Sequence, residues 1–231
     1  MFFDPRYLVF MIPAFILMGI TSWYVRHAYN KWSKIRAGSN LTGYQTAQRL
    51  LSTGSLYGVQ IQGTPGEMTD HYDPRNKTLF LSNGVANSPS VASVAIAAHE
   101  LGHALQDAEE YFPLKFRAAL VPMVNIGSNL GWILILAGLI FRFTELAWLG
   151  VFFFAGGALF ALATLPVELN ASARAKRLVA EADIIRSEEE QRGVNQVLNA
   201  AALTYVAGLL TAVMQLLYYV FLVLGMGRRD D

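Results

Sequence analysis

The chain has 231 residues, of which 54% are hydrophobic and 15% are charged. Soluble domains carry roughly 25% charged residues, so this composition favours a membrane protein over a soluble enzyme. The formal net charge of +1 gives no argument for a nucleic-acid partner, and the absence of cysteine excludes disulfides and thiolate ligands.

Four stretches lack Asp, Glu, Lys and Arg over a length that can cross a bilayer, which takes about 20 apolar residues. They are residues 7–25, 118–141, 146–167 and 200–225. The first is too long and too aromatic to be the core of a signal peptide, so we expect it to remain in the protein. The sequence therefore predicts four transmembrane helices and makes the lipid bilayer a partner.

The distribution of Lys and Arg predicts the orientation of these helices. Residues 26–117 and 168–199 would share one side of the membrane and hold 9 and 5 Lys or Arg residues, whereas the other side holds 4. Because positive residues collect on the cytoplasmic side, we expect both connections in the cytoplasm and both chain ends outside.

The larger connection, residues 26–117, has the pattern of a small mixed domain. Residues 42–52 have helical spacing, and the segments "LYGVQIQG" and "KTLFLS" are typical of strands, with turn residues between them. A second helix is expected from about Pro89 to Asp107, with Ser88 as its N-cap. The smaller connection is helix-prone and is expected to break near Gly193.

The second of these helices contains "HELGH", with His99, Glu100 and His103. Residues four apart lie one turn apart on the same helix face, so the two imidazoles can bind one metal ion. Glu100 projects beside them and can reach a water on that ion without being a ligand. Burying these groups among Ala, Val and Leu would be costly without a partner, which favours a zinc site over an incidental motif.

A catalytic zinc ion takes three protein ligands, so one more ligand must come from elsewhere. Glu168, directly after the third apolar span, is the best candidate. Asp70, His71 and Asp73 are the alternatives, and Pro166 with Glu168 could instead simply begin a helix. From the residues alone these alternatives stay open.

"HELGH" between membrane segments, with "TDHYDPRNKTLFLS" before it and "PVELNASARA" after it, resembles the YugP family of bacterial membrane zinc metallopeptidases. This family is distantly similar to HtpX-type gluzincins, in which a Glu of an E-x-x-x-D helix motif is the third ligand. The resemblance implies zinc held by His99, His103 and Glu168. The sequence differs at Ser172, where those proteases have Asp, and Asn170 stands where many relatives have Asp.

The resemblance implies a mainly α membrane protein with four transmembrane helices and a small α+β zincin-like cytoplasmic domain. Strand 77–82 precedes the histidine helix, as the edge strand does in zincins, and is a candidate for binding an extended substrate. The alternative is an ordinary strand within a small sheet. The expected segments are residues 1–36 (first span and basic extension), 37–117 (catalytic domain), 118–167 (transmembrane hairpin), 168–199 (cytoplasmic helical segment) and 200–231 (last span and tail).

The predicted function is zinc-dependent cleavage of polypeptides at the cytoplasmic face of the bacterial inner membrane, with a membrane protein or membrane-proximal peptide as substrate. Glu100 is the expected general base, and Arg174, His71 and Tyr72 are candidate donors to the oxyanion, of which the first two are favoured. The alternative is a zinc-binding membrane protein without proteolysis, such as a sensor, transporter or structural partner. A homo-oligomer or a partner protein in the membrane stays open.

Overall fold

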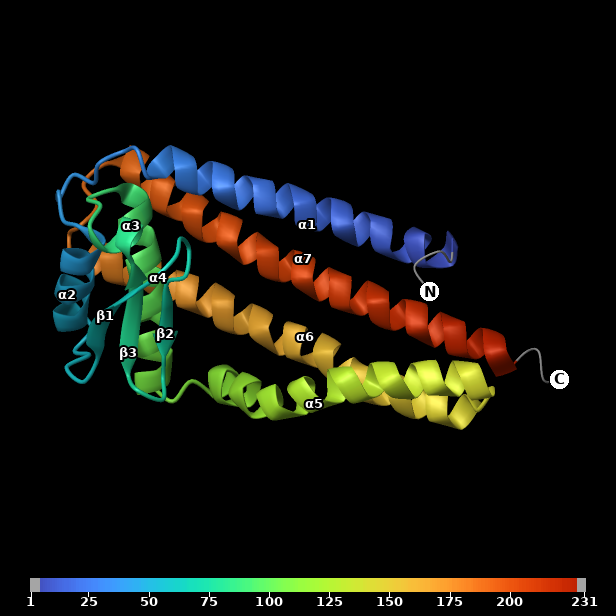
Figure 1. Cartoon of the computed structure of the whole chain (residues 1–231). Coiled ribbons are helices and arrows are strands. Elements are labelled where there is room, and N and C mark those ends of the chain that lie inside the picture. The colour runs from blue at the N-terminus through green and yellow to red at the C-terminus, as the bar shows by residue number, and fades with distance from the viewer. Residues whose placement is uncertain (1–4, 228–231) are drawn as a thin grey trace. The chain divides into compact units, whose positions relative to one another are not determined.

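The computed structural model describes residues 5–227, so the outermost residues of the first and last predicted segments lie outside it. Most of the described chain is helical, with one small sheet (Figure 1). The elements in chain order are α1 (Pro5–Trp32), α2 (Gly43–Thr53), β1 (Gln60–Thr64), β2 (His71–Asp73), β3 (Thr78–Ser82), α3 (Asn83–Ala86), α4 (Val91–Ala108), α5 (Phe112–Phe141), α6 (Thr144–Glu181) and α7 (Glu188–Gly227).

The predicted apolar stretches form four helices, α1, α5, α6 and α7, that are long and apolar enough to cross a bilayer. Each of these helices continues beyond its predicted apolar span. Pro166 does not begin a new helix but lies inside α6. Glu168 therefore stands on the same uninterrupted helix as the apolar residues that precede it.

The chain divides into two compact units. The first, here called the helical unit, consists of residues 5–21, 115–166 and 204–227 of the described chain. Within it α5 and α6 pack so closely that a Cβ on Gly131 would lie 2.8 Å from the carbonyl oxygen of Gly150. Gly127, one turn earlier, likewise faces the carbonyl of Phe153. The glycines of α5 thus serve helix packing, as small residues do in membrane proteins.

The second unit, here called the mixed unit, consists of residues 22–114 and 167–203. Its three-stranded sheet has the order β1-β3-β2, with β1 parallel and β2 antiparallel to β3. The sheet lies beside α4 (Figure 1). Of the two interpretations of strand 77–82, the edge strand is wrong and the ordinary strand within a small sheet is confirmed, because β3 lies between β1 and β2. Its Leu79 and Leu81 are buried.

Helix α4 begins two residues later than the sequence predicts. Its N-cap is Ser90, whose hydroxyl accepts a hydrogen bond from the backbone N–H of Ser93 at 3.2 Å. The carbonyls of Ser88 and Pro89 instead accept hydrogen bonds from Gly43 and Ala37. The residues expected to start the helix therefore hold the preceding loop against it.

The predicted break near Gly193 is also wrong. The link between α6 and α7 covers residues 182–187, and Ser187 accepts a hydrogen bond from the backbone N–H of Glu190 at 3.2 Å, as a helix cap does. Gly193 lies inside α7, where a Cβ would meet the ring of Trp32 at 2.5 Å and Val91 at 2.7 Å. This glycine is needed for close packing of the mixed unit and not for ending a helix.

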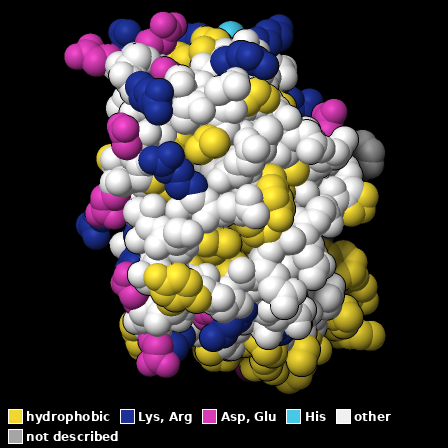
Figure 2. Space-filling view, turned by 90° about the vertical axis from the view of Figure 1, so that its left-hand side faces the viewer, with side chains coloured by type: hydrophobic (Ala, Val, Ile, Leu, Met, Phe, Trp, Pro, Cys, Tyr) yellow, Lys and Arg dark blue, Asp and Glu magenta, His cyan; other side chains and the backbone are white. Residues whose placement is uncertain are grey.

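The outer face of the molecule on the side of α2 carries charges of both signs. Figure 2 shows Lys and Arg side chains interspersed with Asp and Glu side chains and with apolar groups, without one continuous patch of a single sign.

Candidate metal centre

Helix α4 supplies His99, Glu100 and His103 from the middle of the mixed unit. The helix buries its small and apolar residues, and Ala98, Leu101 and Ala104 around the two histidines are almost fully covered. The two imidazoles lie one turn apart, with ring centroids separated by 5.0 Å and ring planes nearly perpendicular. The spacing read from the sequence therefore places both rings on one side of α4.

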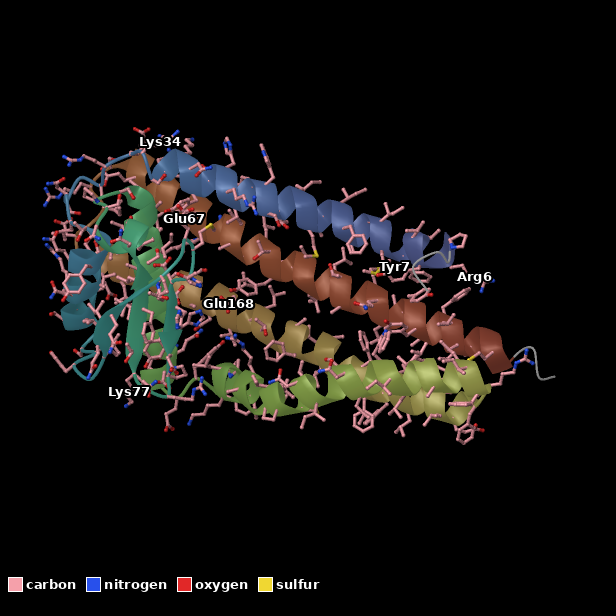
Figure 3. The ribbon with its side chains drawn as sticks, viewed as in Figure 1. Arg6, Tyr7, Lys34, Glu67, Lys77 and Glu168 are labelled. Carbon is pink, nitrogen blue, oxygen red and sulfur yellow. The ribbon has the colours of Figure 1, made fainter. Side chains whose placement is uncertain are left out.

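Helix α6 brings Glu168 to these rings. Figure 3 labels Glu168 on α6 where this helix lies near α4. The two helices approach closely because residue 102, between the histidines, is glycine: a Cβ there would lie 2.4 Å from the carbonyl oxygen of Ala171. Gly102 therefore allows a carboxylate from α6 to reach the histidines of α4.

The three side chains converge on one point. The same Glu168 oxygen, Oε2, lies 3.3 Å from His99 Nε2 and 3.5 Å from His103 Nε2. The side chains of His99, His103 and Glu168 are only 12%, 13% and 3% exposed. Among residues 5–227 they form the one group of three potential metal ligands, with candidate atoms within 4.8 Å of one another.

This spacing fits a tetrahedral zinc ion. Bonds of about 2.0 to 2.2 Å at the tetrahedral angle keep two ligand atoms about 3.3 to 3.6 Å apart. The two Nε2-to-Oε2 distances fall in this range. Two imidazoles and one carboxylate are also a donor set that zinc accepts in catalytic sites, where a fourth position is left for water or substrate.

Each histidine has a second partner on its other ring nitrogen. His99 Nδ1 lies 3.3 Å from the hydroxyl oxygen of Ser172, one turn beyond Glu168 on α6. His103 Nδ1 lies 3.0 Å from Oε1 of Gln106. Both imidazoles are thus held by their Nδ1 atoms so that Nε2 faces Glu168, which is the arrangement that metal-binding histidines need.

Burial and neighbouring charges shift the pKa values of two side chains of α4, Glu100 and His103. Burial raises the pKa of Glu100 above its usual value, although the nearby His99 and His103 oppose this shift. For His103, burial would lower the pKa, but the hydrogen bond to Glu168 and the charge of Glu100 raise it above the usual value overall. A carboxyl group with a raised pKa is suited to exchange protons near neutral pH.

The other candidate third ligands have different partners. Asp70 accepts hydrogen bonds from the backbone N–H and the hydroxyl of Ser82, at 2.7 Å and about 3 Å. Asp73 accepts from Arg75 and Asn76 in the turn after β2. The ring of His71 stacks on Phe80, and its Nδ1 lies 2.8 Å from the carbonyl oxygen of Thr69. The structure brings Glu168, and none of these three, into the group with His99 and His103.

Arg174 lies near the centre but is engaged by several groups. Its Nε donates to Asn170 Oδ1 at 2.6 Å, its Nη1 pairs with Glu109 at 2.7 Å, and its guanidinium lies over the ring of Tyr111. These contacts hold the side chain of Arg174, a residue of α6, against the residues that follow α4. The roles of Arg174 and His71 as oxyanion donors stay predictions.

Gln106 is the residue at this centre that the sequence analysis missed. It is fully buried, and its side chain joins His103 to α6. The signal was its position: residue 106 follows His103 by three and His99 by seven, so it shares their helix face. A glutamine on a buried face needs hydrogen-bond partners, which points to a polar site.

Comparisons with known proteins place the chain in a zinc metallopeptidase family. Residues 7–224 match the family described as "Putative neutral zinc metallopeptidase". The chain is 40% identical over 227 residues to "Putative membrane protease YugP" of Bacillus subtilis (strain 168), an alignment that covers 97% of this chain and 100% of the relative. No solved structure matches the chain.

Proposed function

The chain belongs to the family described as "Putative neutral zinc metallopeptidase", and on this premise we propose that it is a membrane-embedded, zinc-dependent endopeptidase. The observation that carries the proposal is the convergence of His99 Nε2 and His103 Nε2 on a single oxygen of Glu168. In this proposal the two histidines and Glu168 hold the metal, as in gluzincins, and the mixed unit is a zincin-like catalytic domain.

Glu100 is the proposed general base and acid. The chemistry that zinc supplies when bound is Lewis acidity, which polarises the scissile carbonyl and lowers the pKa of water. Glu100 takes a proton from the attacking water, whose oxygen forms a bond to the carbonyl carbon. When the C–N bond breaks, Glu100 gives the proton to the departing amine nitrogen. The raised pKa of Glu100 supports this role, because a carboxylate with a higher pKa is a stronger base toward the water proton.

The proposed substrates are membrane proteins or membrane-proximal peptides. Four apolar helices support a position in the membrane, and Glu168 follows the apolar part of α6 directly in sequence. The excess of Lys and Arg in residues 26–117 and 168–199 supports a cytoplasmic position for the catalytic residues in the bacterial inner membrane.

The test is proteolysis by the purified protein and its Glu100→Gln variant at equal zinc content. We expect the parent to cleave an unstructured polypeptide such as casein. The variant should bind zinc as the parent does and cleave roughly 100- to 10,000-fold more slowly, which is the usual loss when a general base is removed. Glu181→Gln, an exposed substitution at the end of α6, is the matched control and should leave cleavage unchanged.

Two outcomes would count against the proposal. Equal cleavage by the parent and by Glu100→Gln would remove Glu100 from the mechanism. Zinc bound by both proteins, with no cleavage of any polypeptide by either, would support the alternative of a zinc-binding membrane protein that is not a peptidase.

A further inference from the structure

We propose that Gln106 is a positioning residue that fixes the tautomer and the ring orientation of His103. This inference rests on the proposed zinc site, because it concerns how one of the ligands is presented. It depends on a polar chain of four side chains, Arg174, Asn170, Gln106 and His103, which joins α6 to α4 within the mixed unit.

Gln106 makes three hydrogen bonds from a fully buried position. Its Oε1 lies 3.0 Å from His103 Nδ1, and its Nε2 lies 2.8 Å from the carbonyl oxygen of Val167 and 2.9 Å from Asn170 Oδ1. A buried glutamine without such partners would cost free energy, so all its polar atoms are committed. The side chain has no other orientation in which each contact pairs a donor with an acceptor.

The direction of these bonds follows from groups that can act in only one way. The backbone carbonyl of Val167 can only accept, so the Gln106 atom facing it must be the NH₂ group. At the other end, Arg174 Nε can only donate, so the Asn170 atom facing it must be the carbonyl oxygen. Both constraints give the same orientation of Gln106. Its Oε1 must then face His103, and the Nδ1 of His103 must carry the proton.

The consequence concerns the nitrogen that faces Glu168. If Nδ1 of His103 carries the proton, neutral Nε2 has its lone pair directed to the point where the three ligand atoms meet. His99 differs, because its Nδ1 partner is the Ser172 hydroxyl, which can donate or accept. Of the two histidines, His103 is therefore the one that the protein presets for metal binding before the metal arrives.

Substitutions of Asn170 test the direction of the hydrogen bonds between Arg174, Asn170 and Gln106. The Oδ1 of Asn170 accepts both from Gln106 and from Arg174, so an aspartate at this position keeps an acceptor for both donors. We expect Asn170→Asp to retain zinc affinity. Asn170→Leu has a similar size but no acceptor, and we expect it to weaken zinc binding.

The main experiment measures zinc affinity of the full-length protein in detergent by competition with a chromophoric chelator. We expect Gln106→Met to lower the affinity by roughly 10- to 100-fold, the usual effect of losing a residue that orients a metal-binding histidine. The matched control is Gln196→Met, which removes another glutamine of the mixed unit, one that accepts from Trp32 Nε1 at 2.8 Å. It should leave zinc affinity unchanged.

A second measurement does not need zinc. The chain has four histidines, so nitrogen-15 resonances of labelled rings can be assigned by single substitutions. In the metal-free parent at alkaline pH, where the rings are neutral, His103 should be mainly the Nδ1–H tautomer, although its Nε2 also faces Glu168. This measurement stands even if Gln106→Met fails to fold, and it stands if the protein binds zinc but cleaves nothing.

Three results would overturn the proposal: a His103 that is mainly the Nε2–H tautomer in the parent, parent-like zinc affinity in folded Gln106→Met, or equal zinc affinities in Asn170→Asp and Asn170→Leu. A residue with only a structural role would lower the stability of Gln106→Met without changing either zinc affinity or the tautomer. Failure of the parent to bind zinc would instead refute the proposed function while the His103 tautomer still tests the polar chain.

Discussion

Gly102→Ala is the substitution that tests most sharply how α4 and α6 build the centre. The new Cβ would lie 2.4 Å from the carbonyl oxygen of Ala171, and its other near neighbours are also backbone atoms of Ala171. Ordinary van der Waals contact begins near 3.4 Å. Because no flexible side chain can move out of the way, the two helices must part locally by about 1 Å.

The size of this shift decides the outcome. An added 1 Å would lengthen the 3.3 Å separation of His99 Nε2 and Glu168 Oε2 to about 4.3 Å, beyond the about 3.6 Å that a tetrahedral zinc ion spans. We expect zinc affinity to fall by at least roughly 10- to 100-fold, as when a histidine loses its orientation. Overpacking costs about 1 to 3 kcal/mol, and the better helix propensity of alanine returns about 1 kcal/mol, so stability should fall only modestly.

The assay compares zinc affinity and the thermal unfolding midpoint of the variant with those of the parent in detergent. Gly63→Ala in β1 is the matched control, because a Cβ there has nothing within 4 Å. It should leave zinc affinity unchanged. If Gly102→Ala binds zinc as tightly as the parent does, the close approach of α4 and α6 does not set the ligand geometry, and this reasoning is refuted.

Three further predictions concern the third ligand, the acid–base behaviour and the orientation. Glu168→Ala should lower zinc affinity by more than the roughly 100-fold expected for an indirect effect; full zinc binding would move the third ligand to another residue. Burial, together with the 2.9 Å hydrogen bond to Asp107, raises the pKa of Tyr72 well above its usual value of about 10. Asp107→Asn should therefore let Tyr72 ionise at lower pH in an NMR titration, and no change would mean that Asp107 has no part in the shift. Since the chain has no cysteine, Asn40→Cys and Arg142→Cys give unique labelling sites. A membrane-impermeant maleimide added to intact cells should label only the second, and labelling of the first would reverse the predicted orientation.

The spans and the histidine pair could be predicted because they depend on local sequence. A charge-free stretch is either long enough to cross a bilayer or it is not, and residues 99 and 103 share a helix face whatever surrounds them. Glu168 was different, because it lies 65 residues after His103. The residues alone made it the best of several candidates without excluding the others, and the family resemblance favoured it further.

The features that the sequence did not predict depend on contacts between distant segments. Whether β3 is central or at an edge depends on which strands pair with it, and local pattern does not encode that pairing. Glycine has a low helix propensity, so Gly193 was expected to interrupt the helix. It lies inside α7 because the close packing against Trp32 leaves no room for a side chain there. The role of Gln106 could not be predicted from α4 alone, because its partners Val167 and Asn170 lie on α6.

The most direct test of the central claim is removal and return of the metal. The purified parent is assayed for cleavage of an unstructured polypeptide as isolated, after exhaustive chelation, and after one equivalent of zinc is restored. We expect the parent to bind one zinc ion per chain and to cleave the polypeptide as isolated. Cleavage should stop after chelation and return when zinc is restored. Cleavage that survives complete loss of zinc would contradict the account.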